Sequence, residues 1–424
     1  MERFTGLIGI VLIFGIAFLM SNNRKAINYR LVLSGIAIQL SLAVFILKVP
    51  LGKTIFSWIG DAVTKILNFS QKGAEFVFGP LVNSVNMGKA FGSGNEFIFF
   101  FNIIPTIIFV AVLVSVAYYL GIMQRLVKFI AMIVYKLMGV SGSEALSNVA
   151  SAFVGQVEAQ IMIKPYLKGM TMSELLASMT GSMACIAGGV MAVYIAMGVQ
   201  AEYLIAASLM AAPAALVISK IVWPETEISE TKGTVSLEIK KTNANLVDAI
   251  SHGASDGLKV GLNVVAMLIG FIAIIALVDF VLGKIGFGLS SLGMSLSFIG
   301  INLQTLSLNQ ILGTVFSVFA YAMGVPGKDI QVAGSLMGTK MVINEFVAYL
   351  DLAKIKETLD PKTILITSFA LCGFANFSSI AIQVGGIGEL SPERRTDLAK
   401  LGMRALICGT LASYLSATIA GILM

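Results

Sequence analysis

The stretch SAFVGQVEAQIMIKPY, residues 151–166, places Gln156, Glu158 and Gln160 close together in an otherwise apolar chain. A carboxylate in the hydrocarbon core of a bilayer costs roughly 3 kcal/mol, so such a group normally faces a water-filled cavity or a partner. The glycine before the polar residues predicts a turn over residues 155–158, between a helix and a short returning segment. We interpret the stretch as a re-entrant hairpin, whose non-helical backbone is tolerated because it lines a site. The alternative is a polar patch on an ordinary packed helix.

The composition of the 424-residue chain is that of an integral membrane protein built from helices. Hydrophobic residues make up 57% of the chain and charged residues only 12%, whereas soluble proteins carry about 25% charged residues. Long apolar runs indicate spanning helices, because spanning strands show only a weak alternation over about ten residues. The 42 glycines suit close helix packing and interrupted helices. We therefore predict an all-α integral membrane fold.

Several classes of function lack the residues that they need. The formal net charge of +6 comes from Lys and Arg gathered in short loops, a pattern that reports membrane orientation and not nucleic-acid binding. The sequence has one histidine, His252, and no Gly-x-x-x-x-Gly-Lys-Ser/Thr loop, which argues against a His-based metal cluster, a Ser/His/Asp triad and an ATP-driven pump. Cys185, Cys372 and Cys408 lie in apolar stretches and imply no disulfide framework. We expect neither an enzyme nor a bound cofactor.

Eight transmembrane helices are expected, with amphipathic or less apolar segments between them. The first apolar run is interpreted as a span and not as a signal peptide, because basic residues follow it and its start carries only one. The expected spans cover residues 4–20, 31–47, 97–120, 172–197, 203–222, 258–282, 363–384 and 401–424. Interfacial or external helices are expected at 50–95, 121–140 and 307–323.

The loops rich in Lys and Arg predict the orientation of the chain, because cytoplasmic loops are enriched in these residues. Basic residues cluster around Arg24 and Arg30, in the polar linker 223–245 and around Arg395. These three segments are therefore expected in the cytoplasm, and both termini on the other side of the membrane, as in a multi-pass membrane protein.

A second unit repeats the pattern of the first. Residues 338–349 form another polar stretch, and each polar stretch precedes an apolar run that is broken in its middle. Glu158 precedes Gly188 by 188 − 158 = 30 residues, and Glu345 precedes Asn376 by 376 − 345 = 31 residues. The charge pattern places the two hairpins on opposite sides of the membrane. Inverted repeats with discontinuous helices are typical of secondary transporters.

At these positions the chain resembles the concentrative nucleoside transporter family, in the bacterial form that lacks additional N-terminal spans. Four motifs in the expected order carry the resemblance, which extends over about residues 1 to 424. They are GQVEA (155–159) with KPY (164–166), IAGGV (186–190), NEFVAY (344–349) and CGFANFSS (372–379).

The resemblance implies cation-coupled uptake of nucleosides by a homotrimer in the lipid bilayer. In this family, scaffold helices support a domain of hairpins and broken helices that slides across the membrane with its substrate, an elevator-type mechanism. The implied ion is sodium and the implied substrates are uridine-like nucleosides, with purine nucleosides left open. The chain then divides into scaffold helices with an interfacial segment (1–120), a first repeat (121–222), a cytoplasmic linker (223–257), a scaffold helix with an external loop (258–306) and a second repeat (307–424).

By the same resemblance, the first hairpin and its broken helix hold the nucleobase through Gln156, Val157, Glu158 and Val190. An amide and a carboxylate together match the donors and acceptors on the edge of a base, and an apolar side chain suits its face. The family usually has Thr where this sequence has Val157. This exchange removes one hydrogen-bonding group and leaves the base preference open.

The second hairpin and its broken helix are implied to hold the ribose through Glu345, Asn376 and Ser379, with Phe374 lining the same pocket. Ribose hydroxyls are donors, and a carboxylate is a strong acceptor for them. Two of these roles have alternatives. Phe374 equally suits a packing role, and the Ser379 hydroxyl can instead donate to a carbonyl of its own helix.

The resemblance places a sodium site at Ser151, Val154, Cys185 and Ile186, partly through backbone carbonyls. Family members carry Asn and Ser side chains where this sequence has Ser151 and Cys185. Sodium is a hard cation that prefers oxygen, so the thiol is a poor ligand. The carbonyls of Val154 and Ile186 and the Ser151 hydroxyl remain suitable, and we expect weak sodium binding.

Two other functions stay open at the level of the sequence. A proton-coupled nucleoside symporter, in which Glu158 or Glu345 titrates, would differ from a sodium-coupled one in its response to sodium at constant pH. A channel for small solutes is less consistent with two carboxylates on opposed hairpins. Concentrative uptake against a gradient would exclude it.

The expected orientation can be tested by labelling. Cysteines introduced next to Lys232 and next to Arg395 should react with an impermeant maleimide only from the cytoplasmic side, because both segments are basic. Labelling of spheroplasts and of inverted vesicles measures this, and the unmodified chain gives the background from its native cysteines. Reaction of either introduced cysteine from the periplasm would overturn the orientation and, with it, the inverted repeat.

Overall fold

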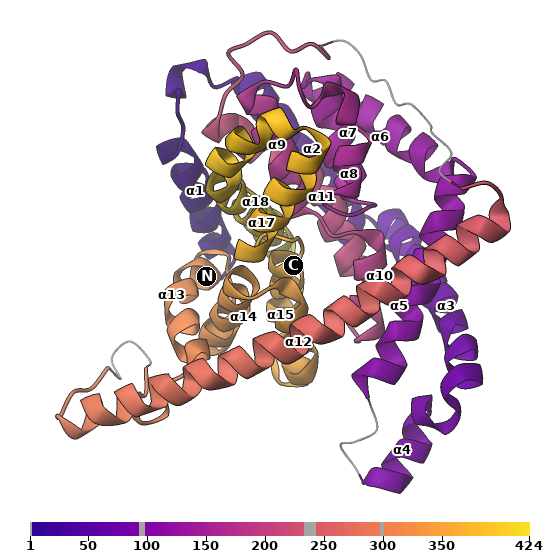
Figure 1. The fold of residues 1–424 in the computed structure, drawn as a ribbon. Coiled ribbons are helices and arrows are strands. Elements are labelled where there is room, and N and C mark those ends of the chain that lie inside the picture. The colour runs from indigo at the N-terminus through magenta and orange to yellow at the C-terminus, as the bar shows by residue number, and fades with distance from the viewer. Residues whose placement is uncertain (1, 93–97, 233–242, 297–300) are drawn as a thin grey trace.

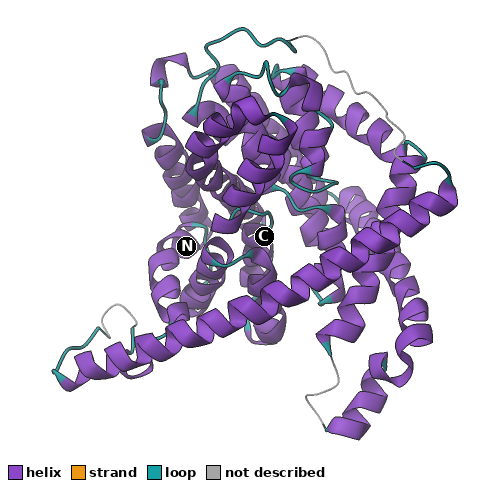
Figure 2. Cartoon of the chain, viewed as in Figure 1, coloured by secondary structure: helices purple, strands orange, loops and turns teal. Residues whose placement is uncertain are grey.

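The computed structural model describes residues 2–92, 98–232, 243–296 and 301–424, with side chains from residue 5 onward. The regular elements within these ranges are helices joined by loops and turns, in agreement with the predicted all-α class (Figure 2). The helices before the first polar stretch are α1 (Glu2–Leu19), α2 (Tyr29–Leu47), α3 (Pro50–Phe78), α4 (Ser84–Phe91), α5 (Phe99–Tyr119) and α6 (Ile122–Met138).

Six helical segments of the described chain are long and apolar enough to cross a membrane. They are Tyr29–Leu47, Phe99–Tyr119, Met172–Ala196, Ala201–Val222, Leu246–Ser291 and Pro392–Leu423. The predicted first span is a shorter apolar helix, and the predicted span 363–384 is divided between two helices. The total of eight spans therefore stays a prediction.

The first polar stretch folds in the predicted order of helix, turn and returning segment. We define the first hairpin as residues 141–169. It contains α7 (Gly142–Ser151), a non-helical tip (152–157), α8 (Glu158–Ile161) and a short 3-10 helix (Lys164–Tyr166). A capping box starts α7, because the Ser141 hydroxyl accepts a hydrogen bond from the Glu144 amide while the Glu144 carboxylate accepts one from the Ser141 amide.

The second polar stretch also folds as a hairpin, which we define as residues 330–355. It contains α14 (Ile330–Val342), a two-residue tip and α15 (Glu345–Ile355), and it follows α13 (Leu308–Ala322). Asn344 in the tip starts α15, because its side-chain oxygen accepts a hydrogen bond from the Val347 amide at 2.9 Å. This cap places Glu345 at the first position of the helix.

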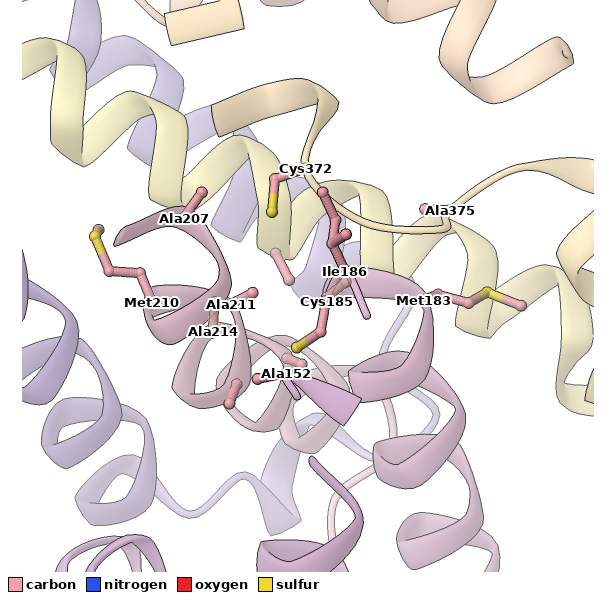
Figure 3. Packing of buried hydrophobic residues seen from close by; sticks show 14 of the residues in the cluster. Ala152, Met183, Cys185, Ile186, Ala207, Met210, Ala211, Ala214, Cys372 and Ala375 are labelled. Atoms are coloured by element: carbon pink, nitrogen blue, oxygen red, sulfur yellow. The ribbon is translucent and has the colours of Figure 1, made fainter. Parts of the chain in front are cut away.

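Each hairpin precedes a helix that is interrupted in its middle, as predicted. The first pair is α9 (Met172–Ala184) with α10 (Gly188–Ala196), and the second pair is α16 (Pro361–Leu371) with α17 (Phe377–Leu390). The two interruptions lie against each other (Figure 3). Gly373 has a φ of +107°, and a Cβ at this position would lie 2.7 Å from the Met183 carbonyl oxygen. Glycine is the residue that accommodates both this backbone angle and this close approach.

The longest helix, α12 (Leu246–Ser291), has 46 residues and a length of about 69 Å. It begins inside segment 223–257, which was expected to be a linker. The reason is local, because the Asn245 side chain caps the first turn by accepting a hydrogen bond from the Asp248 amide at 2.9 Å. Figure 1 shows α12 as a rod that crosses the whole molecule.

Glycines on α12 allow it to lie directly against α5. Gly253, Gly257 and Gly261 recur every four residues, so they share one face of the helix. A Cβ at Gly257 would lie 2.6 Å from the Ile108 Cα atom of α5. The most apolar membrane-length segment of α12 lies at the surface of the protein. This is expected of a helix that contacts lipid or another subunit.

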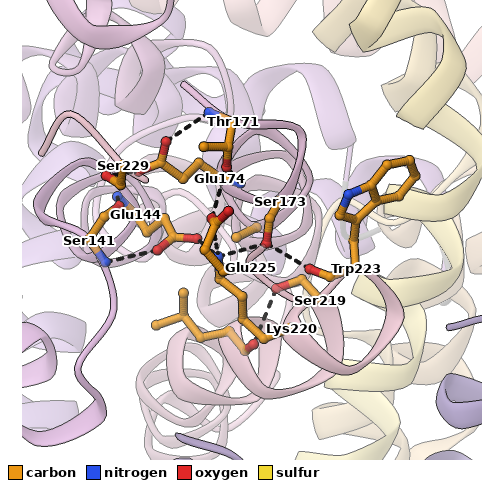
Figure 4. A network of polar contacts seen from close by, with 12 residues as sticks. Ser141, Glu144, Thr171, Ser173, Glu174, Ser219, Lys220, Trp223, Glu225 and Ser229 are labelled. Atoms are coloured by element: carbon orange, nitrogen blue, oxygen red, sulfur yellow. Dashed lines mark hydrogen bonds and ion pairs between the residues drawn. The ribbon is translucent and has the colours of Figure 1, made fainter. Parts of the chain in front are cut away.

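The described part of the linker packs against the base of the first hairpin (Figure 4). The Ser229 hydroxyl donates to Glu174 at 2.5 Å, and Glu174 caps the start of α9. Lys220, at the end of α11 (Ala201–Val222), forms a buried ion pair with Glu144. These polar contacts join the hairpin, α9, α11 and the linker. Together with the last helix, α18 (Arg395–Leu423), the helices α9 and α11 form the buried centre of the protein.

Candidate functional site

The tip of the second hairpin carries a buried carboxylate whose two oxygens both accept hydrogen bonds. Asn376, in the interruption between α16 and α17, donates to one Glu345 oxygen at 3.0 Å. Tyr194 on α10 donates to the other at 3.1 Å. A buried charge needs such donors, because it has lost the solvation of water. Glu345 therefore joins the second hairpin to both interrupted helices.

Asn376 is held in one orientation by its role as a helix cap. Its side-chain oxygen accepts hydrogen bonds from the Ser379 amide at 2.9 Å and from the Ser378 hydroxyl at 2.7 Å. The amide nitrogen is thereby directed at Glu345. The structure thus brings together three predicted ribose contacts, Glu345, Asn376 and Ser379, while Phe374 is half-buried against the core.

The predicted base contacts at the first tip lie in a more open setting. Gln156, Val157 and Val190 are half-buried, and Glu158 is exposed. The Gln156 oxygen lies 3.5 Å from the Gln383 side-chain nitrogen of α17, at the limit of a hydrogen bond. Among the described residues, Glu158 makes no hydrogen bond or ion pair with another side chain. The first tip therefore presents an unpaired carboxylate, in contrast to the second.

Tyr194 was not among the predicted site residues. It lies four positions after Val190 on α10, and this spacing places both side chains on the same face of the helix. Its ring packs against Tyr349 and Phe346 of α15, with centroids 4.4 Å and 5.7 Å apart. The helical spacing was the signal in the sequence that would have indicated it.

Lys340 is a buried residue near the second tip that was also not predicted. Its ammonium group is buried on α14 and donates to the carbonyl oxygens of Ala370 at 2.8 Å and Cys372 at 3.1 Å. These carbonyls end α16, where the helix dipole favours a positive charge. Lys340 also attracts Glu345 electrostatically. The signal in the sequence was a lysine in an apolar helix, which normally has a partner.

The predicted cation ligands meet where the first tip touches the interruption after α9. The Gly188 amide donates to the Phe153 carbonyl at 3.0 Å, which fixes the two segments to each other. Within the described chain, the buried carbonyl oxygens of Val154 and Ile186 have no hydrogen-bond donor. Such oxygens suit a hard cation, whereas the buried Cys185 thiol does not.

Family models match most of the chain. The model described as "Na+ dependent nucleoside transporter C-terminus" matches residues 203–421, and the corresponding N-terminus model matches residues 8–81. A model described as "Nucleoside recognition" matches residues 100–201 between them.

The chain belongs to the sodium-dependent nucleoside transporter family. A nucleoside permease, NupC, of Helicobacter pylori is 39% identical over 98% of this chain and 96% of its own length. Sodium/nucleoside cotransporter 1 of Mus musculus is 36% identical, and the match covers 100% of this chain and 64% of that protein. An uncharacterized transporter of Haemophilus influenzae is 43% identical, with 100% of this chain and 98% of that protein covered.

Solved structures agree with this membership. A structure of CNTnw in an inward-facing substrate-bound state has a TM-score of 0.91 and 40% identity, and the match covers 100% of this chain and 98% of that one. These findings confirm the family that the motifs indicated. The family is one of membrane transporters.

Proposed function

We propose that this transporter imports uridine-like nucleosides by symport with sodium. The observation that carries the proposal is the Glu345 carboxylate, which is buried at a hairpin tip and directed by Asn376 and Tyr194 from two interrupted helices. A carboxylate in this position is an acceptor for the hydroxyls of a ribose. We further propose a homotrimer in the bacterial inner membrane, with both termini in the periplasm.

The two tips have different chemistry, which supports a division of roles between base and sugar. Glu345, Asn376 and Ser379 would hold the ribose, with Phe374 beside it. The first tip would hold the base, through Gln156, Val157, Glu158 and Val190. Because Glu158 has no partner among the described side chains, its carboxylate is free to accept from a donor on the base edge. Val157 offers no hydrogen bond, so it would contribute only contact area.

Sodium would bind at the first tip through the carbonyls of Val154 and Ile186 and the hydroxyl of Ser151. Cys185 lies beside them and adds sulfur instead of oxygen. The ion would bridge the tip and the interruption, and so support the position of Gln156 two residues further on. Transport would follow an elevator-type mechanism, in which the hairpins and broken helices move together past the helices at the surface, including α12.

Proton coupling is the second candidate, favoured by one observation. The Cys185 thiol stands where a sodium site needs an oxygen, and Glu158 is an exposed carboxylate on the same tip. Uptake would then be driven by the proton gradient in place of the sodium gradient.

Uptake into proteoliposomes tests the proposed function directly. An inward sodium gradient should drive accumulation of labelled uridine above equilibrium, whereas a proton gradient or no gradient should not. Accumulation that follows only the proton gradient would transfer the coupling to the second candidate. Equilibration without accumulation under all three conditions would indicate a channel.

The ribose role of Glu345 predicts a large effect of Glu345→Gln. The change removes a charged acceptor from a buried hydroxyl, so uridine affinity should fall by about 10- to 100-fold, equivalent to roughly 1.5–3 kcal/mol. Calorimetric titration of the purified protein measures this, with Glu357→Gln on the exposed surface as the control. Unchanged affinity in a normally assembled Glu345→Gln variant would remove Glu345 from the site.

The ion site predicts that Ser151→Asn strengthens sodium binding. Asn reaches further than Ser and adds a carbonyl oxygen, so apparent sodium affinity should rise and uridine binding should depend more steeply on sodium. Linkage requires that uridine then strengthens sodium binding by the same factor. Uridine titrations at several sodium concentrations compare the two proteins. Superimposed curves would show that position 151 is not a ligand.

A further inference from the structure

A fully buried glutamine, Gln160, connects the returning arm of the first hairpin to α9. Its side-chain oxygen accepts a hydrogen bond from the Ser178 hydroxyl at 2.6 Å. Its side-chain nitrogen donates to the Ser182 hydroxyl at 2.8 Å. Ser178 and Ser182 lie one turn apart on α9, so the planar amide of Gln160 spans both of them. Both the oxygen and the nitrogen of the Gln160 side-chain amide therefore have hydrogen-bond partners.

The same network continues to the proposed cation site. The Ser182 and Ser151 hydroxyl oxygens are 3.0 Å apart, and Ser151 donates to the Ser147 carbonyl at 2.7 Å. A serine hydroxyl has one proton, so Ser151 must accept from Ser182. The hydrogen bonds then run in one direction, from Ser178 through Gln160 and Ser182 to Ser151. This chain joins α7, α8 and α9, the three segments around the ion site.

We propose that Gln160 is a positioning residue that keeps the first tip attached to α9 when the cation site is empty. The side chains of this network are uncharged, and each of their hydroxyl groups has a hydrogen-bond partner in the absence of an ion. Both properties allow the network to hold the tip when the cation site is empty. The buried carbonyls of Val154 and Ile186 remain free for sodium. Sodium therefore adds to an attachment that already exists, and its effect on nucleoside binding is small.

This inference rests on the proposed nucleoside and sodium sites. The experiment distinguishes a failure of the inference from a failure of those proposals. In the unmodified protein, removal of sodium should weaken uridine binding less than tenfold. In Gln160→Ala, binding without sodium should fall by about a further tenfold, because two buried hydrogen bonds are lost. At saturating sodium the ion itself should hold Ser151, Val154 and Ile186 together, and affinity should largely recover.

The experiment is calorimetric titration of uridine in sodium chloride and in choline chloride at equal ionic strength. The quantity of interest is the ratio of the two dissociation constants, because a general loss of stability would change both alike. Ser178→Ala, which removes one hydrogen bond and adds no bulk, provides a milder variant should Gln160→Ala fail to fold. Gln39→Ala is the matched control, since Gln39 is equally buried and donates to Met210 and Ser416 away from the site.

A larger ratio in Gln160→Ala or Ser178→Ala, with an unchanged ratio in Gln39→Ala, supports the role. An unchanged ratio in the folded Gln160→Ala and Ser178→Ala variants overturns it, as does an equal rise in the control. Failure of the unmodified protein to bind uridine or another nucleoside would instead contradict the proposed function.

Discussion

Backbone polar groups inside a bilayer need partners within the protein, and this constraint organises the whole structure. Helices of the described structure stop at two tips and two interruptions, and contacts made by these segments supply such partners. Lys340 of the second hairpin donates to the carbonyls that end α16, and the Gly188 amide donates to the first tip. A substrate needs the same kinds of hydrogen-bond donors and acceptors as these backbone groups. Polar side chains able to hold a substrate are therefore concentrated at the tips and interruptions.

The two hairpins meet this constraint by different means. At the second tip a buried carboxylate and a buried ammonium group are both surrounded by hydrogen-bond partners, which is the condition for keeping charges away from water. At the first tip the internal contacts are made by neutral side chains, among them Gln160 and Ser182. The carboxylate that follows this tip, Glu158, is exposed. The second tip thus offers a charged acceptor that its neighbours hold in place, whereas the first offers an exposed carboxylate and backbone carbonyls without donors in the described chain.

The sequence predicted the parts of this protein that break the apolar pattern. Polar residues such as Glu345 and Asn376 have few places to go in a membrane, so the hairpins and the interruptions followed from their positions, whereas the grouping of these side chains at one site was implied by the family resemblance. The positions where helices begin were harder to predict. For example, Asn245 caps α12 well before its apolar stretch begins. The contacts that Tyr194 and Gln160 make with distant segments could not be predicted, although helical spacing marks the first residue and its polarity the second. Their role depends on which helix lies opposite, and only the fold determines that.

The contact of Gly373 with Met183 has a consequence for motion. Separating the two interruptions would break the close packing of Gly373 on the Met183 carbonyl. We therefore expect the two broken helices to move together as one rigid body. Bending of the chain outside this contact would be easier at Gly139 (φ +69°), which is exposed after α6, than at Gly324 (φ +87°), which is buried after α13.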